Sequence, residues 1–138
     1  MTNEKPQDAN ALKGKTGLRR LLNAFGYSLQ GFRAAWQNEA AFREEAMLTI
    51  VLTPVALLLP VTGLEKLLLI LSLLLLVLVE LLNSAVEAVV DRIGPEIHPM
   101  SKYAKDAGSC AVLFALTFCI FVWCVLLWDA FVSPLMAH

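Results

Sequence analysis

The sequence predicts an all-α membrane protein, in which an amphipathic interfacial helix precedes three membrane-spanning helices. The composition is 58% hydrophobic and 17% charged, with a mean hydropathy of +0.67, whereas soluble domains are about half apolar and about a quarter charged. Charged side chains are absent from three stretches, residues 46–64, 67–79 and 107–128. The residues before the first stretch instead repeat apolar side chains at helical spacing, which indicates a helix with one apolar face.

The 138 residues allow one domain at most. Residues 1–17 are polar and lack an apolar period, so we expect a disordered N-terminal tail. Residues 18–138 then form a single membrane domain. Within it, we expect the interfacial helix over residues 18–37 and membrane-spanning helices over residues 39–59, 64–92 and 101–131.

The interfacial helix is predicted from apolar residues at steps of three and four between Leu18 and Trp36. Its other faces carry Arg19, Arg20 and Arg33. A basic amphipathic helix with aromatic residues fits the membrane interface, where the apolar stripe sinks among acyl chains and arginines meet lipid phosphates. The alternative is a helix packed on the protein's own core.

The three spans differ in length and in their boundary signals. Asn38 is the expected N-cap of the first span, with Glu39 in its first turn, and Pro54 should kink this helix. Its uncharged part is short for a bilayer, which needs about 20 residues. Gly94 and the following proline end the second span. The third span carries Trp123 and Trp128 as interfacial anchors.

The basic residues predict the orientation. Seven of the eleven Lys and Arg residues precede the first uncharged stretch, three lie between Arg92 and Lys105, and none follows the last stretch. By the positive-inside rule, the N-terminus is cytoplasmic and the C-terminus lies outside. No dense basic face indicates a nucleic-acid partner. Three cysteines without a C-x-x-C spacing argue against a disulfide framework or a zinc site.

The second predicted span carries a polar stripe. Glu80, Asn83, Glu87 and Asp91 follow at steps of three, four and four, which places them on one helix face within about 80° of arc. A carboxylate in hydrocarbon costs several kcal/mol unless it is paired, hydrated or protonated. Intramembrane acids therefore indicate a functional site. The alternative is a polar clamp between helices that holds an oligomer together.

Further charges should meet this stripe at the cytoplasmic rim. Lys105 and Asp106 open the third span, and Glu39 opens the first. Clustered carboxylate oxygens suit a hard cation such as Mg²⁺, which keeps waters and phosphate oxygens as its other ligands. Arg20 and Lys105 can offset the charge of a triphosphate. The pattern predicts a metal-phosphate site above a buried base.

Three segments carry a resemblance to a known family. They read Glu80-x-Leu-Asn83-Ser84-Ala-Val-Glu87-x-x-Val-Asp91, Asn38-Glu39-Ala-Ala-Phe42-Arg43 and Ala104-Lys105-Asp106-x-Gly108-Ser109. Together they resemble bacterial diacylglycerol kinase, over the region from Arg20 to Trp128. The resemblance implies a homotrimer in the bacterial inner membrane that phosphorylates diacylglycerol to phosphatidate with ATP and Mg²⁺, at active sites built between neighbouring chains.

The resemblance also implies roles for individual residues. Glu80 matches the general base, Glu39 and Glu87 hold the metal, and Asn83 and Asp91 support the active site. The positions that match ATP contacts, besides Glu39 and Glu87, are Arg20, Tyr27, Glu96, His98, Lys105 and Asp106. The positions that border the lipid substrate are Arg20, Arg33, Trp36, Glu45, Ser109, Trp123 and Trp128.

Two alternative functions stay open at this point. A kinase of another lipid alcohol, such as undecaprenol, would share the stripe, and the sequence does not report the choice of lipid. A small proton or cation pathway lined by Glu80, Glu87 and Asp91 belongs to another class. Such a pathway needs polar groups across the whole membrane, yet residues 67–79 offer only Ser72, which disfavours it.

Overall fold

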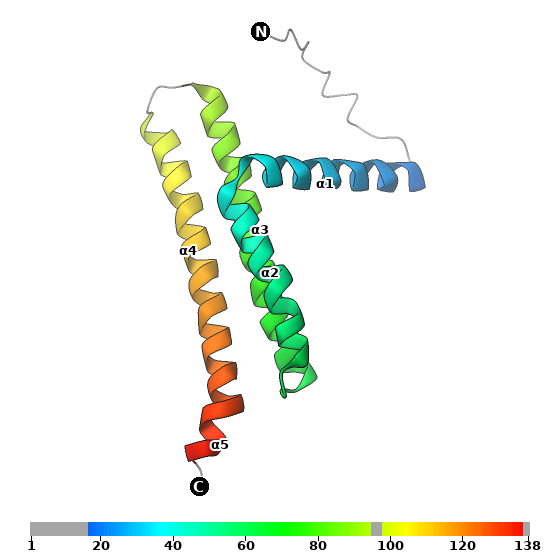
Figure 1. Ribbon diagram of the computed structural model, residues 1–138. Coiled ribbons are helices and arrows are strands. Elements are labelled where there is room, and N and C mark those ends of the chain that lie inside the picture. Colours follow the sequence, from blue (N-terminus) through cyan, green and yellow to red (C-terminus); the bar gives the residue numbers. More distant parts are fainter. Residues whose placement is uncertain (1–16, 95–97, 137–138) are drawn as a thin grey trace.

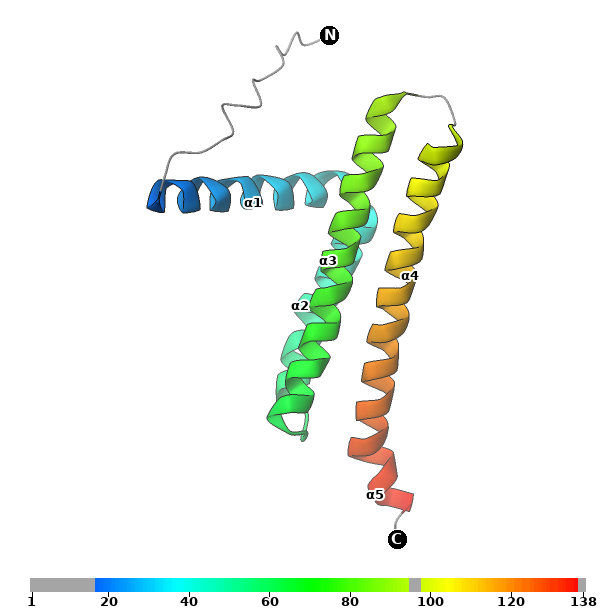
Figure 2. The ribbon, with the colours of Figure 1, turned by 180° about the vertical axis from the view of Figure 1, so that it is seen from behind.

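The computed structural model of the chain describes residues 17–94 and 98–136, and its regular elements there are all helical. They are α1 (Leu18–Asn38), α2 (Ala40–Leu58), α3 (Gly63–Ile93), α4 (Pro99–Leu127), a π-helical turn η2 (Trp128–Val132) and α5 (Ser133–Met136). Helices α2, α3 and α4 run along one another, whereas α1 points sideways out of the bundle from the start of α2, and α3 and α4 extend beyond its level (Figures 1 and 2). This arrangement matches a membrane bundle with one surface helix.

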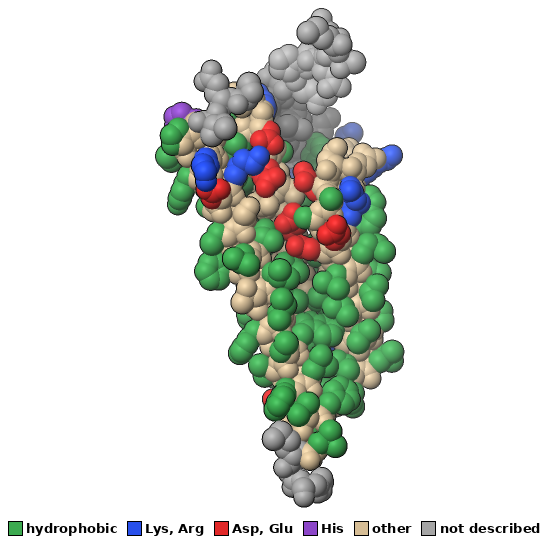
Figure 3. Space-filling model, turned by 60° about the vertical axis from the view of Figure 1, so that its left-hand side comes forward, with side chains coloured by type: hydrophobic (Ala, Val, Ile, Leu, Met, Phe, Trp, Pro, Cys, Tyr) green, Lys and Arg blue, Asp and Glu red, His purple; other side chains and the backbone are tan. Residues whose placement is uncertain are grey.

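Helix α3 is the middle of the bundle, because it packs against both α2 and α4. Leu69, Leu73 and Leu76 of α3 are buried almost completely. The Ser72 hydroxyl donates to the Leu69 carbonyl at 2.7 Å and lies 3.5 Å from the Cys119 sulfur of α4. The outward surface below the charged end is largely apolar (Figure 3), as expected of a face that meets lipid.

Two helices, Gly63–Ile93 and Pro99–Leu135, are long and apolar enough to cross a membrane. Helix α2 falls short, because Arg43, Glu44 and Glu45 lie in its first two turns and leave only residues 46–58 uncharged. At 1.5 Å per residue this stretch is about 20 Å long. The hydrocarbon core of a typical bilayer is thicker, at about 30 Å. The uncharged stretch 67–79 of α3 has the same length as that of α2, whereas residues 107–128 of α4 cover the full thickness.

The junction of α1 and α2 is held by aromatic rings and one arginine. The Phe32 ring stacks on Trp36 with centroids 6.0 Å apart and meets Phe42 of α2 edge-on at 5.4 Å. Arg43 Nη1 donates to the carbonyls of Trp36 and Gln37 at 2.9 and 3.3 Å. Since the last carbonyls of a helix lack partners within the helix, Arg43 caps α1 and fixes its direction relative to α2.

The apolar stripe of α1 is exposed from Leu18 to Leu29, whereas Phe32 and Trp36 at its end lie at the junction with α2. Leu18 is 73% exposed and Phe25 is 63% exposed, and Ala35 is the one buried residue of this helix. The alternative of a helix packed on the protein's own core is therefore wrong for this chain taken singly. An exposed apolar stripe beside three arginines fits a helix lying in the membrane interface.

Several predicted boundaries need correction. The predicted N-cap Asn38 is instead the last residue of α1, where its amide donates to the Ala34 carbonyl at 2.8 Å. Glu39 is extended and is itself the N-cap of α2. Helix α4 begins at Pro99, two residues earlier than predicted, because His98 Nδ1 accepts from the Met100 N–H at 3.2 Å and caps it.

The connection from α2 to α3 is closed by side chains. The Thr62 hydroxyl accepts from the Glu65 N–H, and the Glu65 carboxylate accepts from the Thr62 N–H at 2.6 Å, which is a capping box. Lys66 Nζ donates to the Leu57 carbonyl at 2.8 Å and so satisfies the end of α2. This closure fixes the register between α2 and α3.

Candidate active site

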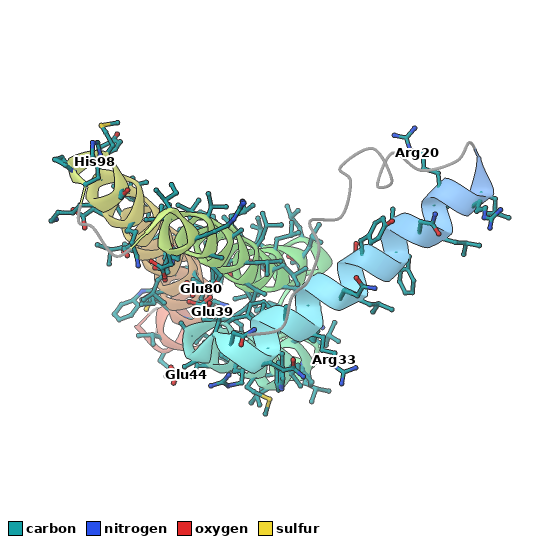
Figure 4. All side chains as sticks on the ribbon, turned by 90° about the horizontal axis from the view of Figure 1, so that it is seen from above. Arg20, Arg33, Glu39, Glu44, Glu80 and His98 are labelled. Carbon is teal, nitrogen blue, oxygen red and sulfur yellow. The ribbon has the colours of Figure 1, made fainter. Side chains whose placement is uncertain are left out.

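The predicted base, Glu80, lies on the buried face of α3 and is only 5% exposed. The carboxylates of Glu87 and Glu39 are its charged neighbours, and Glu80 in turn acts electrostatically on Glu45 of α2. Figure 4 shows Glu39 and Glu80 close together where α1, α2 and α3 meet. Among the residues with described side chains, none hydrogen-bonds the Glu80 carboxylate. A buried carboxylate without a donor is free to accept a proton from a substrate.

The Glu87 carboxylate is hydrogen-bonded by Asn83, which lies one helical turn earlier on α3. Asn83 Nδ2 donates to Glu87 Oε1 at 3.3 Å, as their spacing of four residues on one face allows. Asn83 Oδ1 is buried and accepts no hydrogen bond within the described parts of the chain. It faces Gly108 of α4. The stripe predicted from the sequence is thus a set of neighbouring side chains.

The C-terminal end of α3 and the N-terminal end of α4 are joined by an ion pair. Lys105 Nζ lies 2.9 Å from Asp91 Oδ1, and Glu87 also acts on this lysine electrostatically. Asp106 pairs with Lys102, one turn away on α4. Acidic and basic side chains gather at this end of the bundle, above the apolar surface (Figure 3). A phosphate approaching from water would therefore meet Lys105 just above the carboxylates.

A groove of about 710 Å³ opens between α1 and α3, a volume typical of small-molecule sites. Its walls are mostly apolar, with Phe32 and Ala35 on one side and Leu81 and Leu82 on the other, and Glu39 reaches its edge. A second groove of about 460 Å³ lies between α1 and α2, and its walls include Arg33 and Trp36, two of the predicted lipid contacts. Both grooves lie beside α1, near its junction with α2.

One chain does not bring all the predicted site residues together. Arg20 lies in the first turn of α1, far from Glu80, and His98 caps α4 on the other side of the bundle (Figure 4). Tyr27 is also on the outer half of α1. Glu96 lies outside the described residues. Along α4, Ser109 lies near the charged end, whereas Trp123 and Trp128 lie near the opposite end.

The sequence did not predict that Glu45 and Glu80 are electrostatic neighbours. Glu45 was predicted at the border of the lipid, and the structure brings it beside the buried base. A signal was available, because Phe42, Glu45 and Ala46 share a helix face, and both Phe42 and Ala46 are buried. Glu44, the neighbouring acid, points outward (Figure 4).

The donor set fits a hard divalent cation. No group of three or more His, Cys, Asp or Glu side chains that could hold a metal occurs among the described residues. Mg²⁺ does not require one, because it commonly takes one or two carboxylates and completes its shell with waters and phosphate oxygens. Glu39 and Glu87 each act electrostatically on Glu80 and so offer two carboxylates in the neighbourhood of the base.

Comparison with known proteins decides the family. The family model described as prokaryotic diacylglycerol kinase matches residues 26–127. The chain belongs to this family. A diacylglycerol kinase from Escherichia coli is 51% identical over 84% of the chain and 95% of its own length. Diacylglycerol kinases from Pseudomonas aeruginosa and Helicobacter pylori are 56% and 43% identical, over 83% and 78% of the chain and 94% and 84% of their own lengths.

Membership of the prokaryotic diacylglycerol kinase family confirms the resemblance found in the sequence, and with it an enzyme of the kinase class. The matched region contains the polar stripe, the α1–α2 junction and the rim of α4, whereas Arg20 precedes it. Membership of this family and the presence of two long apolar helices together identify a membrane protein. The alternative of a proton or cation pathway has no support among these relatives, since each is named as a kinase.

Proposed function

We propose that this protein transfers the γ-phosphoryl group of ATP to the free hydroxyl of diacylglycerol. The hydroxyl oxygen attacks the γ-phosphorus, the bond from that phosphorus to the β–γ bridging oxygen breaks, and the products are phosphatidate and ADP. The observation that carries the proposal is Glu80, a residue only 5% exposed that lies beneath a charged rim, within the region that the family model matches.

The residues divide the work of phosphoryl transfer into positioning, charge neutralisation and proton removal. Glu80 takes the hydroxyl proton as the new bond forms. Lys105, held by Asp91 at 2.9 Å, places an ammonium where the triphosphate enters. The grooves beside α1 receive the glycerol and acyl parts of the lipid from the side, so the substrate reaches Glu80 without leaving the membrane.

Glu39 and Glu87 would hold Mg²⁺, and the electrostatic effect of both on Glu80 supports this assignment. When bound, the cation supplies positive charge against the phosphate oxygens of ATP. Asn83 keeps the Glu87 carboxylate in place through its amide. The two ligands come from α2 and α3, so the packing of these two helices sets their separation.

The assembly that we propose is a homotrimer in the bacterial inner membrane, with shared active sites. Arg20 and His98 support shared sites, because one chain holds both away from Glu80, and a neighbouring chain can supply them. We further propose that α2 crosses the membrane as a third span with its charged first turns at the cytoplasmic surface. The Lys and Arg distribution supports a cytoplasmic N-terminus and an external C-terminus.

The choice of lipid is tested by purifying the full-length protein and supplying labelled ATP with a panel of lipid alcohols. Diacylglycerol should be phosphorylated at least tenfold faster than undecaprenol or a long-chain fatty alcohol. A preference for undecaprenol would reassign the protein to another lipid-alcohol kinase. If none of the alcohols accepts the label in the presence of Mg²⁺, the proposed function is wrong.

A further inference from the structure

Gly108 of α4 lies against Asn83, a residue of the polar stripe on α3. A Cβ atom added at Gly108 would collide with Asn83 Oδ1 and would lie 3.3 Å from Asn83 Cγ. At every other glycine that the structure describes, an added Cβ meets nothing within 4 Å. The two helices reach their observed separation here because position 108 has no side chain.

The Asn83 amide is fixed by what lies at its two ends. Its NH₂ group donates to Glu87 Oε1 at 3.3 Å. An ionised carboxylate only accepts hydrogen bonds, so the NH₂ group must face Glu87 and the amide oxygen must face away from it. That oxygen is buried against Gly108 and accepts no hydrogen bond from the described residues.

We infer that Gly108 is a positioning residue for Glu87, acting through the Asn83 amide. A methyl group at position 108 would displace the amide oxygen, turn the amide and break its hydrogen bond to Glu87. The Glu87 carboxylate would then lose the contact that orients it towards the cation. Groups that orient metal ligands typically contribute tenfold to a hundredfold to metal affinity. The inference rests on the proposed role of Glu87 as a metal ligand.

The test measures cation binding without turnover. Mn²⁺ replaces Mg²⁺ as a paramagnetic probe, and its binding to the purified full-length protein is followed by electron paramagnetic resonance with a non-hydrolysable ATP analogue. Gly108→Ala should raise the Mn²⁺ dissociation constant about tenfold. Gly26→Ala, which adds a methyl group in open space on α1, should leave it unchanged. A shift of the melting temperature alone, with Mn²⁺ affinity intact, would overturn the inference.

A second variant separates positioning from a general disturbance of the fold. Asn83→Ala removes the two crowded atoms, so that the next atom is Asn83 Cα at an ordinary 3.9 Å from the added Cβ. Asn83→Ala alone should weaken Mn²⁺ binding about tenfold, and adding Gly108→Ala should weaken it no further. If Gly108→Ala fails to fold, the double variant should fold again. A double variant that binds Mn²⁺ far more weakly than Asn83→Ala, or that fails to fold, would contradict the inference.

Glu87→Gln distinguishes this inference from the proposed function. If Glu87→Gln weakens Mn²⁺ binding and Gly108→Ala does not, the positioning role is wrong and the metal-ligand role stands. If Glu87→Gln itself binds Mn²⁺ as the wild type does, the metal-ligand role is wrong and the inference fails with it.

Discussion

Replacing Glu80 by glutamine tests the base directly, because the change keeps the size of the side chain and removes its ability to accept a proton. Proton transfer by a positioned side chain contributes about 10²- to 10⁴-fold to a rate, so turnover of Glu80→Gln should fall by that factor. At about 1.4 kcal/mol for each tenfold change, the barrier rises by about 3 to 5 kcal/mol. The Michaelis constant for MgATP should stay nearly constant, since Glu39 and Glu87 are untouched.

Although Glu80→Gln should lose turnover, its folded state should become more stable. Glu80 is 5% exposed, no described residue hydrogen-bonds its carboxylate, and Glu39, Glu45 and Glu87 are its charged neighbours. Removing this charge relieves repulsion and the cost of burying an ion. The unfolding free energy should therefore increase, by on the order of 1 kcal/mol, with a higher melting temperature in the same detergent.

The assay combines labelled-ATP turnover, nucleotide affinity, melting temperature and oligomer size on purified wild-type and variant protein. The polar-clamp hypothesis predicts near-normal turnover, because glutamine replaces glutamate well as a hydrogen-bonding group. An intact oligomer of Glu80→Gln with turnover within a fewfold of the wild type would refute the base assignment. Turnover lost by the expected factor in an intact oligomer would contradict the clamp and support the base assignment.

Three further outcomes are expected from the same structure. Glu87→Gln should raise the Mg²⁺ concentration at half-maximal activity about tenfold, measured by Mg²⁺ titration at fixed ATP, because one of two ligand charges is lost. Mixed oligomers of Glu80→Gln and Lys105→Ala subunits should regain part of the activity if these residues meet across an interface. Failure of such mixtures, with mixed oligomers confirmed, would favour sites within one subunit. A reporter enzyme fused after His138 should be active only outside the cytoplasm, and cytoplasmic activity would reverse the proposed topology.

The helices and the stripe could be predicted because both follow from local periodicity. Steps of three and four residues place Leu18 to Trp36 on one face of α1, and the same arithmetic aligns Glu80, Asn83, Glu87 and Asp91 on α3. These patterns depend on one helix at a time. The capping box from Thr62 to Glu65 was equally visible as a Thr-x-x-Glu pattern before an apolar run.

The features that could not be predicted depend on contacts between helices, and the periodicity within one helix carries no information about such contacts. Glu45 is an electrostatic neighbour of Glu80 because of how α2 packs on α3. Position 108 has no room for a side chain because Asn83 of α3 lies against it. Asn38 is a good N-cap residue by type, yet its amide bonds back to Ala34 and the chain turns one residue later. The π-helical turn before Pro134 follows from a proline without an N–H, which disturbs the preceding turn.

The short uncharged stretches of α2 and α3 have a consequence for the surrounding bilayer. Both are about 20 Å long and end at Glu45 and Glu80, whereas α4 matches a full hydrocarbon layer. If α2 spans the membrane as proposed, we expect the resulting hydrophobic mismatch to be relieved by local thinning of the leaflet beside it. Headgroups and water would then reach the depth of Glu80, where a diacylglycerol hydroxyl would meet the base. Turnover should fall as host lipids with longer chains thicken the bilayer, which reconstitution in phosphatidylcholines of increasing chain length measures.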